Sequence, residues 1–76
     1  MPKYEAGDFV KFEMKDERTG GSEWMWLVVD RDDAIERVVF GRLDSQPVVF
    51  DSELRLGQEL AVSYDNIRES RKPNQF

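Results

Sequence analysis

The chain has 76 residues, a formal net charge of −5, and neither cysteine nor histidine. This length accommodates a single domain. The two missing residue types exclude disulfides and the thiolate and imidazole ligands of an ordinary structural zinc site. Acidic character disfavours a nucleic-acid partner, because phosphate binding draws on clustered Lys and Arg. We therefore expect no metal, no cofactor and no nucleic-acid ligand.

The distribution of apolar residues bears on location. The longest apolar stretch, Trp24 to Val29, is far shorter than a membrane-spanning helix requires. The first residues lack the charged, apolar and small-residue order of a signal peptide. Absence of cysteine suits a reducing compartment. We expect no membrane partner and a cytoplasmic location.

Five segments have the composition of strands, each bounded by turn residues. In the first, Val10, Phe12 and Met14 alternate with charged residues, which is the pattern of a half-buried strand. The second is apolar on both faces, and the third contains Gly41, where a bulge or a close backbone approach is expected. The predicted strands cover residues 8–15, 23–31, 36–43, 48–50 and 59–64.

The end of the chain is predicted to be less regular. Asp65 has the side chain of an N-cap, so residues 65–69 are expected to form one helical turn. Residues 70–76 are polar and include Pro73, and we expect them to fray. The predicted organisation is one small β domain over residues 1–69 followed by a flexible tail over residues 70–76.

Five short strands in so few residues predict an all-β fold. A small five-stranded SH3-like barrel is favoured, because closure removes exposed strand edges. A strongly bent antiparallel sheet is the alternative. The second strand is apolar on both faces, so alternation alone does not choose its inward face. Strand alternation predicts core positions on the other segments, namely Val10, Phe12, Val39, Leu43, Leu56, Leu60 and Val62.

The order of several short motifs resembles the bacterial domain of unknown function 2314. The similar segments span most of residues 8–69 and are Phe9-Val10-Lys11-Phe12, Glu23 with Met25-Trp26-Leu27 and Val29, Gly41-Arg42-Leu43, Pro47, Leu54-Arg55-Leu56-Gly57 and Asp65-Asn66-Ile67. Members of that family often end in an acidic residue followed by Trp, where this chain has Glu69-Ser70. The resemblance implies a small bacterial domain, stand-alone or appended, and implies no activity. It also implies the inward face of the second strand, which adds Met25, Leu27 and Val29 to the predicted core.

Catalytic motifs find little support. No serine has a histidine base available anywhere in the chain. Glu23 and Asp44 flank apolar strands and form the least implausible carboxylate pair, but solvated acids are the better interpretation in so charged a chain. A calcium loop starting at Asp30 fails, because its sixth position is Ile35 and its twelfth is Gly41. We expect no catalytic residue and no enzyme activity.

One group of apolar residues stands out. If Met25 and Leu27 face the core, then Trp24, Trp26 and Val28 face outward. Antiparallel pairing would set Val38 and Phe40 beside them on the same outer face. Polar neighbours would form a rim around this face, namely Glu23, Arg37 and Arg42.

Two interpretations of these outward residues remain open. Tyr4, Phe9 or the turn at Ile67 would cover the tryptophans if a bent sheet buries parts of both faces. If the face is exposed, its composition is typical of an interaction site. The leading hypothesis is a non-catalytic module that binds a protein partner or a second copy of itself. The alternatives are a small ligand-binding or enzymatic subunit whose site a partner chain completes, and an RNA-associated SH3-like barrel.

Overall fold

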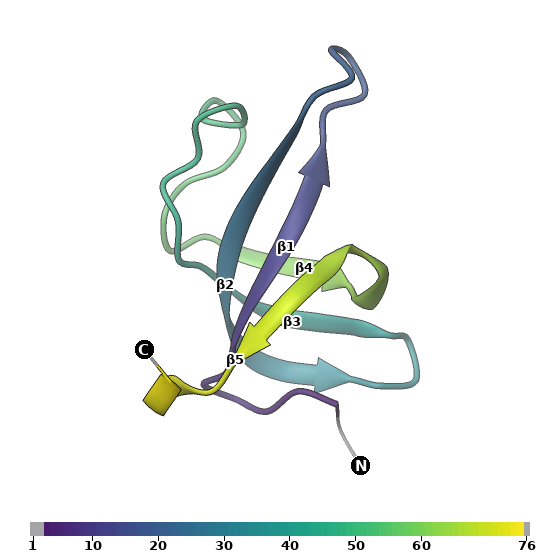
Figure 1. Ribbon diagram of the computed structural model, residues 1–76, viewed down its shortest axis with the longest axis vertical. Helices are drawn as coiled ribbons and strands as arrows, with labels where there is room; N and C mark the ends of the chain where they lie inside the picture. Colours follow the sequence, from purple (N-terminus) through teal and green to yellow (C-terminus); the bar gives the residue numbers. More distant parts are fainter. Residues whose placement is uncertain (1–2, 76) are drawn as a thin grey trace.

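The computed structural model describes residues 3–75, which form one antiparallel sheet with the strand order β4-β3-β2-β1-β5 (Figure 1). The all-β prediction is confirmed. The strands are β1 (Phe9–Lys15), β2 (Ser22–Asp33), β3 (Val38–Leu43), β4 (Glu59–Ser63) and β5 (Ile67–Arg71), and the short 3-10 helices are η1 (Tyr64–Asn66) and η2 (Pro73–Gln75).

The β1–β2 hairpin follows directly from its alternating residues. Val10 pairs with Leu27 and Phe12 with Met25, so the inward-facing residues of both strands meet on one face. All four side chains are buried. The predicted choice of inward face on β2 is therefore confirmed.

The pairing of β2 with β3 contains a register shift between Val29 and Arg31. Gly41 lies opposite Val29, and a Cβ atom at this position would approach the Val28 carbonyl oxygen to 2.1 Å. The strands can therefore come this close only where the side chain is absent. The close approach predicted for Gly41 is confirmed, and the bulge lies in the strand opposite.

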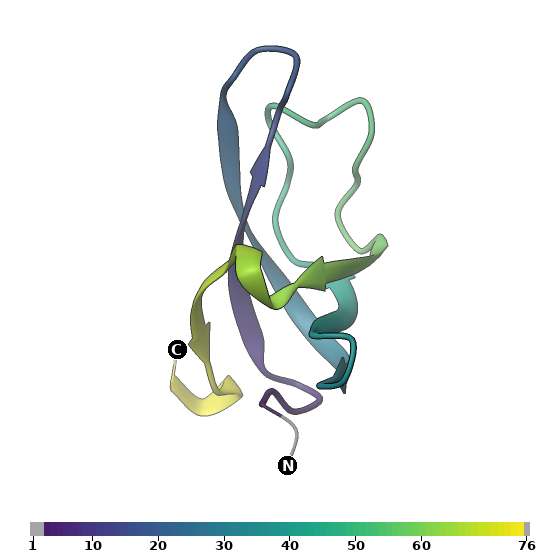
Figure 2. The same cartoon turned by 90° about the vertical axis from the view of Figure 1, so that its right-hand side faces the viewer.

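The long loop of residues 44–58 does not contain the strand predicted at residues 48–50. These residues form a bend and the start of a turn. They lie beside the upper part of the β1–β2 hairpin in both views (Figures 1 and 2). Two side chains of this loop, Phe50 and Leu54, are buried in the core. Leu56, which was expected in the core, is 59% exposed. The prediction for Leu56 was wrong because the loop anchors itself through other residues.

The predicted helical turn at residues 65–69 is also wrong in extent and cap. Ser63 caps η1 by accepting a hydrogen bond from the Asp65 amide, and the chain returns to strand at Ile67. Strand β5 continues to Arg71, with Ser70 opposite Val10. The first two residues of the expected frayed tail thus pair with β1, because that strand has an open edge there.

The sheet is bent but not closed, so the preferred closed barrel is corrected to its alternative. Strands β4 and β5 are the two edges, and η1 joins them directly (Figure 2). The buried apolar core combines the inward strand residues with side chains from the N-terminal segment, the long loop and η1: Tyr4, Val10, Phe12, Met25, Leu27, Val29, Val39, Leu43, Phe50, Leu54, Val62 and Tyr64. Leu60 is only partly buried.

Candidate functional site on the outer sheet face

Trp24 and Trp26 project from β2 on the face opposite the core, as predicted. Trp24 is 53% exposed, while Trp26 and Val28 are half-buried. Their neighbours on β1 are Glu13, opposite Trp24, and Lys11, opposite Trp26. The outward orientation is a consequence of strand alternation, because the adjacent Met25 and Leu27 fill the core.

Cations lie over these rings. The Lys11 ammonium is 5.4 Å from the ring centroid of Trp24 and 5.6 Å from that of Trp26. The Arg71 guanidinium lies 5.5 Å from the Trp26 centroid. All three separations are within the range of cation–π attraction. The arrangement holds Lys11 between two indoles; we define Lys11, Trp24 and Trp26 as the tryptophan–lysine surface.

Phe40 does not join this surface, contrary to the predicted alignment of the two rows. Strand β2 continues to Asp33, so the turn that follows sets Val38 opposite Asp33 and Phe40 opposite Arg31. Arg42 takes the position opposite Val28. The predicted continuous five-residue patch is therefore interrupted by a charged side chain, because the β2–β3 turn begins after Asp33 and sets Phe40 several residues away from Trp26.

Phe40 has its own cationic neighbour. The Arg31 guanidinium lies 4.1 Å from the Phe40 ring centroid. Together with Glu59, Leu60 and Ala61 these side chains line a hollow of about 430 Å³ (hereafter the β3–β4 hollow) whose full lining is Asp30, Arg31, Phe40, Gly41, Glu59, Leu60 and Ala61. This volume lies in the range of small-ligand sites.

The predicted rim residues are dispersed. Arg42 remains on the outer face and pairs with Asp30 at 3.2 Å. Arg37 is in the β2–β3 turn, where it lies over the Tyr64 ring and pairs with Asp65. Glu23 lies on the inner face, two residues before Met25, and does not contribute to an outer rim.

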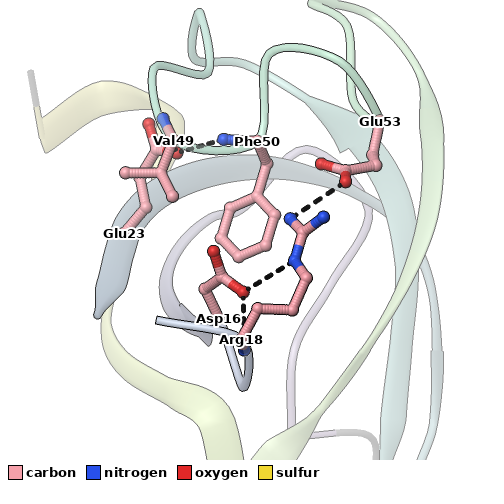
Figure 3. Close-up of polar contacts among 6 residues, drawn as sticks. All are labelled: Asp16, Arg18, Glu23, Val49, Phe50 and Glu53. Carbon is pink, nitrogen blue, oxygen red and sulfur yellow. Dashed lines mark hydrogen bonds and ion pairs between the residues drawn. The ribbon is translucent and has the colours of Figure 1, made fainter. Parts of the chain in front are cut away.

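Glu23 instead fixes the long loop. Its carboxylate accepts a hydrogen bond from the backbone amide of Val48 at 2.7 Å. It also accepts from the amides of Val49 at 2.9 Å and Phe50 at 3.2 Å (Figure 3). A carboxylate that accepts several amides is the charge-assisted arrangement that orders loops. This role replaces the pairing of Glu23 with Asp44 considered from the sequence, and it explains why residues 48–50 are not a strand.

A second polar contact holds the same loop to the β1–β2 turn. The buried Asp16 carboxylate accepts from the Arg18 backbone amide at 3.0 Å and side chain at 3.1 Å, and Arg18 reaches Glu53 at 3.2 Å (Figure 3). The hydrogen bonds from Arg18 lower the pKa of Asp16, and the same contact raises the pKa of Arg18. Both groups therefore stay ionised, as a structural ion pair does.

A smaller hollow of about 280 Å³ separates the end of β1 from β4; we call it the β1–β4 hollow. Its lining is Phe12, Glu13, Met14, Lys15, Glu17, Ala61, Val62, Ser63 and Asn66. A hydrogen bond with the Ser22 side chain and the contact with Arg68 lower the pKa of Glu13. A general acid at neutral pH needs a raised carboxyl pKa, so Glu13 is not poised for that role.

Two further findings concern chemistry and topology. Across residues 3–75, no group of three or more acidic side chains is arranged to hold a metal ion. No helix in the same range is long and apolar enough to cross a membrane.

No protein-family model, no curated protein and no solved structure matched the chain.

Sequence reasoning found the two tryptophans but missed the cations above them. Lys11 was visible as an outward residue of β1, and cross-strand pairing with β2 was the signal that set it beside Trp26. Arg71 has no such signal, because residues 70–76 are polar, include Pro73 and carry no strand pattern.

Proposed function

We propose that this protein is a non-catalytic binding module of the bacterial cytoplasm that contacts a protein partner through the tryptophan–lysine surface. The carrying observation is Trp24, a large aromatic side chain 53% exposed on the middle of a sheet, with Lys11 above it. Indole rings on strands bury much area on binding and lose little conformational entropy. The family resemblance is compatible with a small bacterial domain of this kind.

The chemistry of the surface indicates which partner groups it suits. Lys11 presents ammonium donors beside two indole faces, so it favours a carboxylate that is flanked by apolar side chains. Glu13, which neighbours Trp24, is already paired with Arg68 at 3.1 Å and so competes less for Lys11. The net charge of −5 opposes a nucleic-acid ligand.

The direct test is capture of partners from a bacterial lysate on immobilised wild-type protein, Trp24→Ala, Lys11→Ala and Val48→Ala. Val48 is 76% exposed but belongs to the long loop, so it is the matched control for an exposed apolar side chain. We expect Trp24→Ala and Lys11→Ala to weaken association by about ten-fold or more, and Val48→Ala to retain it.

Stability must be measured beside binding. Because Trp24 is half exposed, Trp24→Ala should change the free energy of unfolding by no more than about 1 kcal/mol. Trp26→Ala should also weaken association more than it lowers the melting temperature. If no captured protein depends on Trp24 and scattering shows a monomer, the proposal is wrong; a dimer that Trp24→Ala dissociates would identify a second copy as the partner.

A second candidate function rests on the β3–β4 hollow. Its volume of about 430 Å³ and the stacked Phe40 and Arg31 side chains suit a small planar ligand. This is the ligand-binding alternative, in which a partner chain would complete the site. Saturable ligand binding that Phe40→Ala abolishes and Trp24→Ala preserves would favour it.

A further inference from the structure

Strand β4 is an edge strand with an accessible backbone. The Tyr64 amide donates to the Arg37 carbonyl and the Leu43 amide donates to the Gln58 carbonyl. In an antiparallel ladder, hydrogen-bonded pairs alternate along a strand. Even-numbered residues of β4 therefore bond to β3, and the backbone groups of Glu59, Ala61 and Ser63 point away from the sheet.

The other edge is better protected. Strand β5 carries Arg68 and Arg71, which form ion pairs with Glu13 and Glu69, and Pro73 follows it closely. Charged side chains and proline are the usual means of blocking an edge. In β4 the sequence after Glu59 is Leu-Ala-Val-Ser, without charge or proline.

The edge of β4 also lies between two hollows. Ala61 lines both the β3–β4 hollow and the β1–β4 hollow. Side chains of a strand added to this edge would point alternately to the two sides of the sheet, and hence toward the two hollows. Backbone hydrogen bonds combined with pockets for alternate side chains are the elements of strand addition.

Charge and apolar surface define the occupant. The two hollows are lined by the apolar side chains of Phe40, Leu60, Met14 and Val62 among others. Their charged lining residues are Glu13, Glu17, Asp30, Glu59, Arg31 and Lys15. Glu13 pairs with Arg68 and Asp30 with Arg42, and the chain as a whole carries a net charge of −5, which favours a basic partner. Glu17 and Glu59 are exposed, and no ion pair between residues of the described range engages them. Lysine or arginine matches such a lining, because its aliphatic stem covers apolar surface while its charge meets a carboxylate.

We propose that the edge of β4 binds an extended segment of a partner protein in which basic and apolar side chains alternate, and that this segment pairs with the backbone of Glu59, Ala61 and Ser63. The tryptophan–lysine surface lies outside the lining of both hollows. The two proposals therefore stand on separate residues and fail separately.

The test uses the whole chain and synthetic peptides. The probe alternates valine and lysine; one control replaces lysine by glutamate, and another keeps the lysines but has N-methylated backbone amides. Amide spectra recorded during titration should show saturable shifts centred on Glu59, Ala61 and Ser63, together with slower hydrogen exchange there. Both control peptides should bind about ten-fold more weakly or not at all. The glutamate peptide lacks charge complementarity, and the N-methylated peptide lacks backbone donors.

Ala61→Pro removes the edge-facing donor without removing a bond to β3, since proline is tolerated at such a position. We expect Ala61→Pro to weaken binding of the valine–lysine peptide by about ten-fold. Ala61→Thr keeps the backbone amide and should retain binding. If Ala61→Pro fails to fold, the N-methylated peptide decides. Equal binding of that peptide, shifts centred on another surface, or protection of β4 by self-association without peptide would overturn the proposal.

Discussion

At the residue scale, Tyr64 carries the most perturbed phenol described in the structure. It is buried in η1 and donates a hydrogen bond to Asp32 of β2. Its ring meets that of Tyr4 edge-on, with centroids 5.3 Å apart. One side chain thus ties the corner between the two edge strands to the centre of the sheet.

This contact predicts a loss of stability at alkaline pH. Burial, together with the hydrogen bond to Asp32, raises the pKa of Tyr64 from 10.0 to about 12. Between these values the unfolded chain releases the proton while the folded chain retains it, so the free energy of unfolding should fall as pH rises from 10 to 12. Denaturant titrations across this range, with tyrosinate absorbance as the monitor, measure the effect.

Tyr64→Phe is the comparison for this prediction. Below pH 10 the variant should be less stable than wild type by about 1 kcal/mol, because one hydrogen bond is lost. Its alkaline decline should be shallower, and what remains belongs in part to Tyr4, whose pKa burial also raises. An alkaline decline identical to that of wild type would show that Tyr64 does not carry it.

At the element scale, the long loop owes its conformation to side chains rather than to a backbone ladder. Glu23 holds one part of it through three amides, and the Asp16–Arg18–Glu53 contacts hold another (Figure 3). Phe50 and Leu54 then bury their side chains under it. The loop covers the upper end of the core, so its order and core packing depend on each other.

Glu23→Gln should therefore loosen the loop. The amide side chain lacks the charge and presents a donor toward the backbone donors of Val48 and Val49, so a cost of about 1–3 kcal/mol is expected. Hydrogen exchange at the Val49 and Phe50 amides should accelerate, while exchange in β3 should follow global stability alone.

Glu36→Gln is the matched control for that change. Glu36 is an exposed glutamate in the β2–β3 turn. Its substitution should alter the free energy of unfolding by less than about 0.5 kcal/mol. Loop exchange in Glu23→Gln that is no faster than in Glu36→Gln would contradict the assigned role of the carboxylate.

At the scale of the whole molecule, the core of this open five-stranded sheet is covered by segments outside the strands as well as by the strands themselves. The strands supply one wall; the N-terminal segment, the long loop and η1 supply side chains over it. Small domains often add a metal or disulfides. Because this sequence has neither cysteine nor histidine, the stability of the fold rests on apolar packing and hydrogen bonds.

Thermal stability should accordingly be independent of metal. The melting temperature with a strong chelator should equal that with added calcium or zinc, because binding that favours the native state would raise it. Circular dichroism melts under both conditions measure this. A clear fall on chelation would show a stabilising ion and overturn the prediction.

The sequence by itself determined which residues of the main strands face inward. Period-two alternation placed Val10 and Phe12 in the core. On β2 it defined two apolar rows, and the family resemblance chose the row of Met25, Leu27 and Val29 as the inward one. The same reasoning placed Trp24 and Trp26 outside, and Gly41 at a close approach. These are local consequences of strand geometry and residue size.

Only the tertiary structure decided which distant groups meet. Residues 48–50 have the composition of a strand, but the Glu23 carboxylate, far away along the chain, takes their amides. Strand β2 continues to Asp33, which sets Phe40 opposite Arg31 and away from Trp26, and residues beyond Ile67 pair with the open edge of β1 as β5. Backbone amides form hydrogen bonds with whichever acceptors the folded chain brings close to them. Local periodicity in the sequence does not predict which distant acceptors these are.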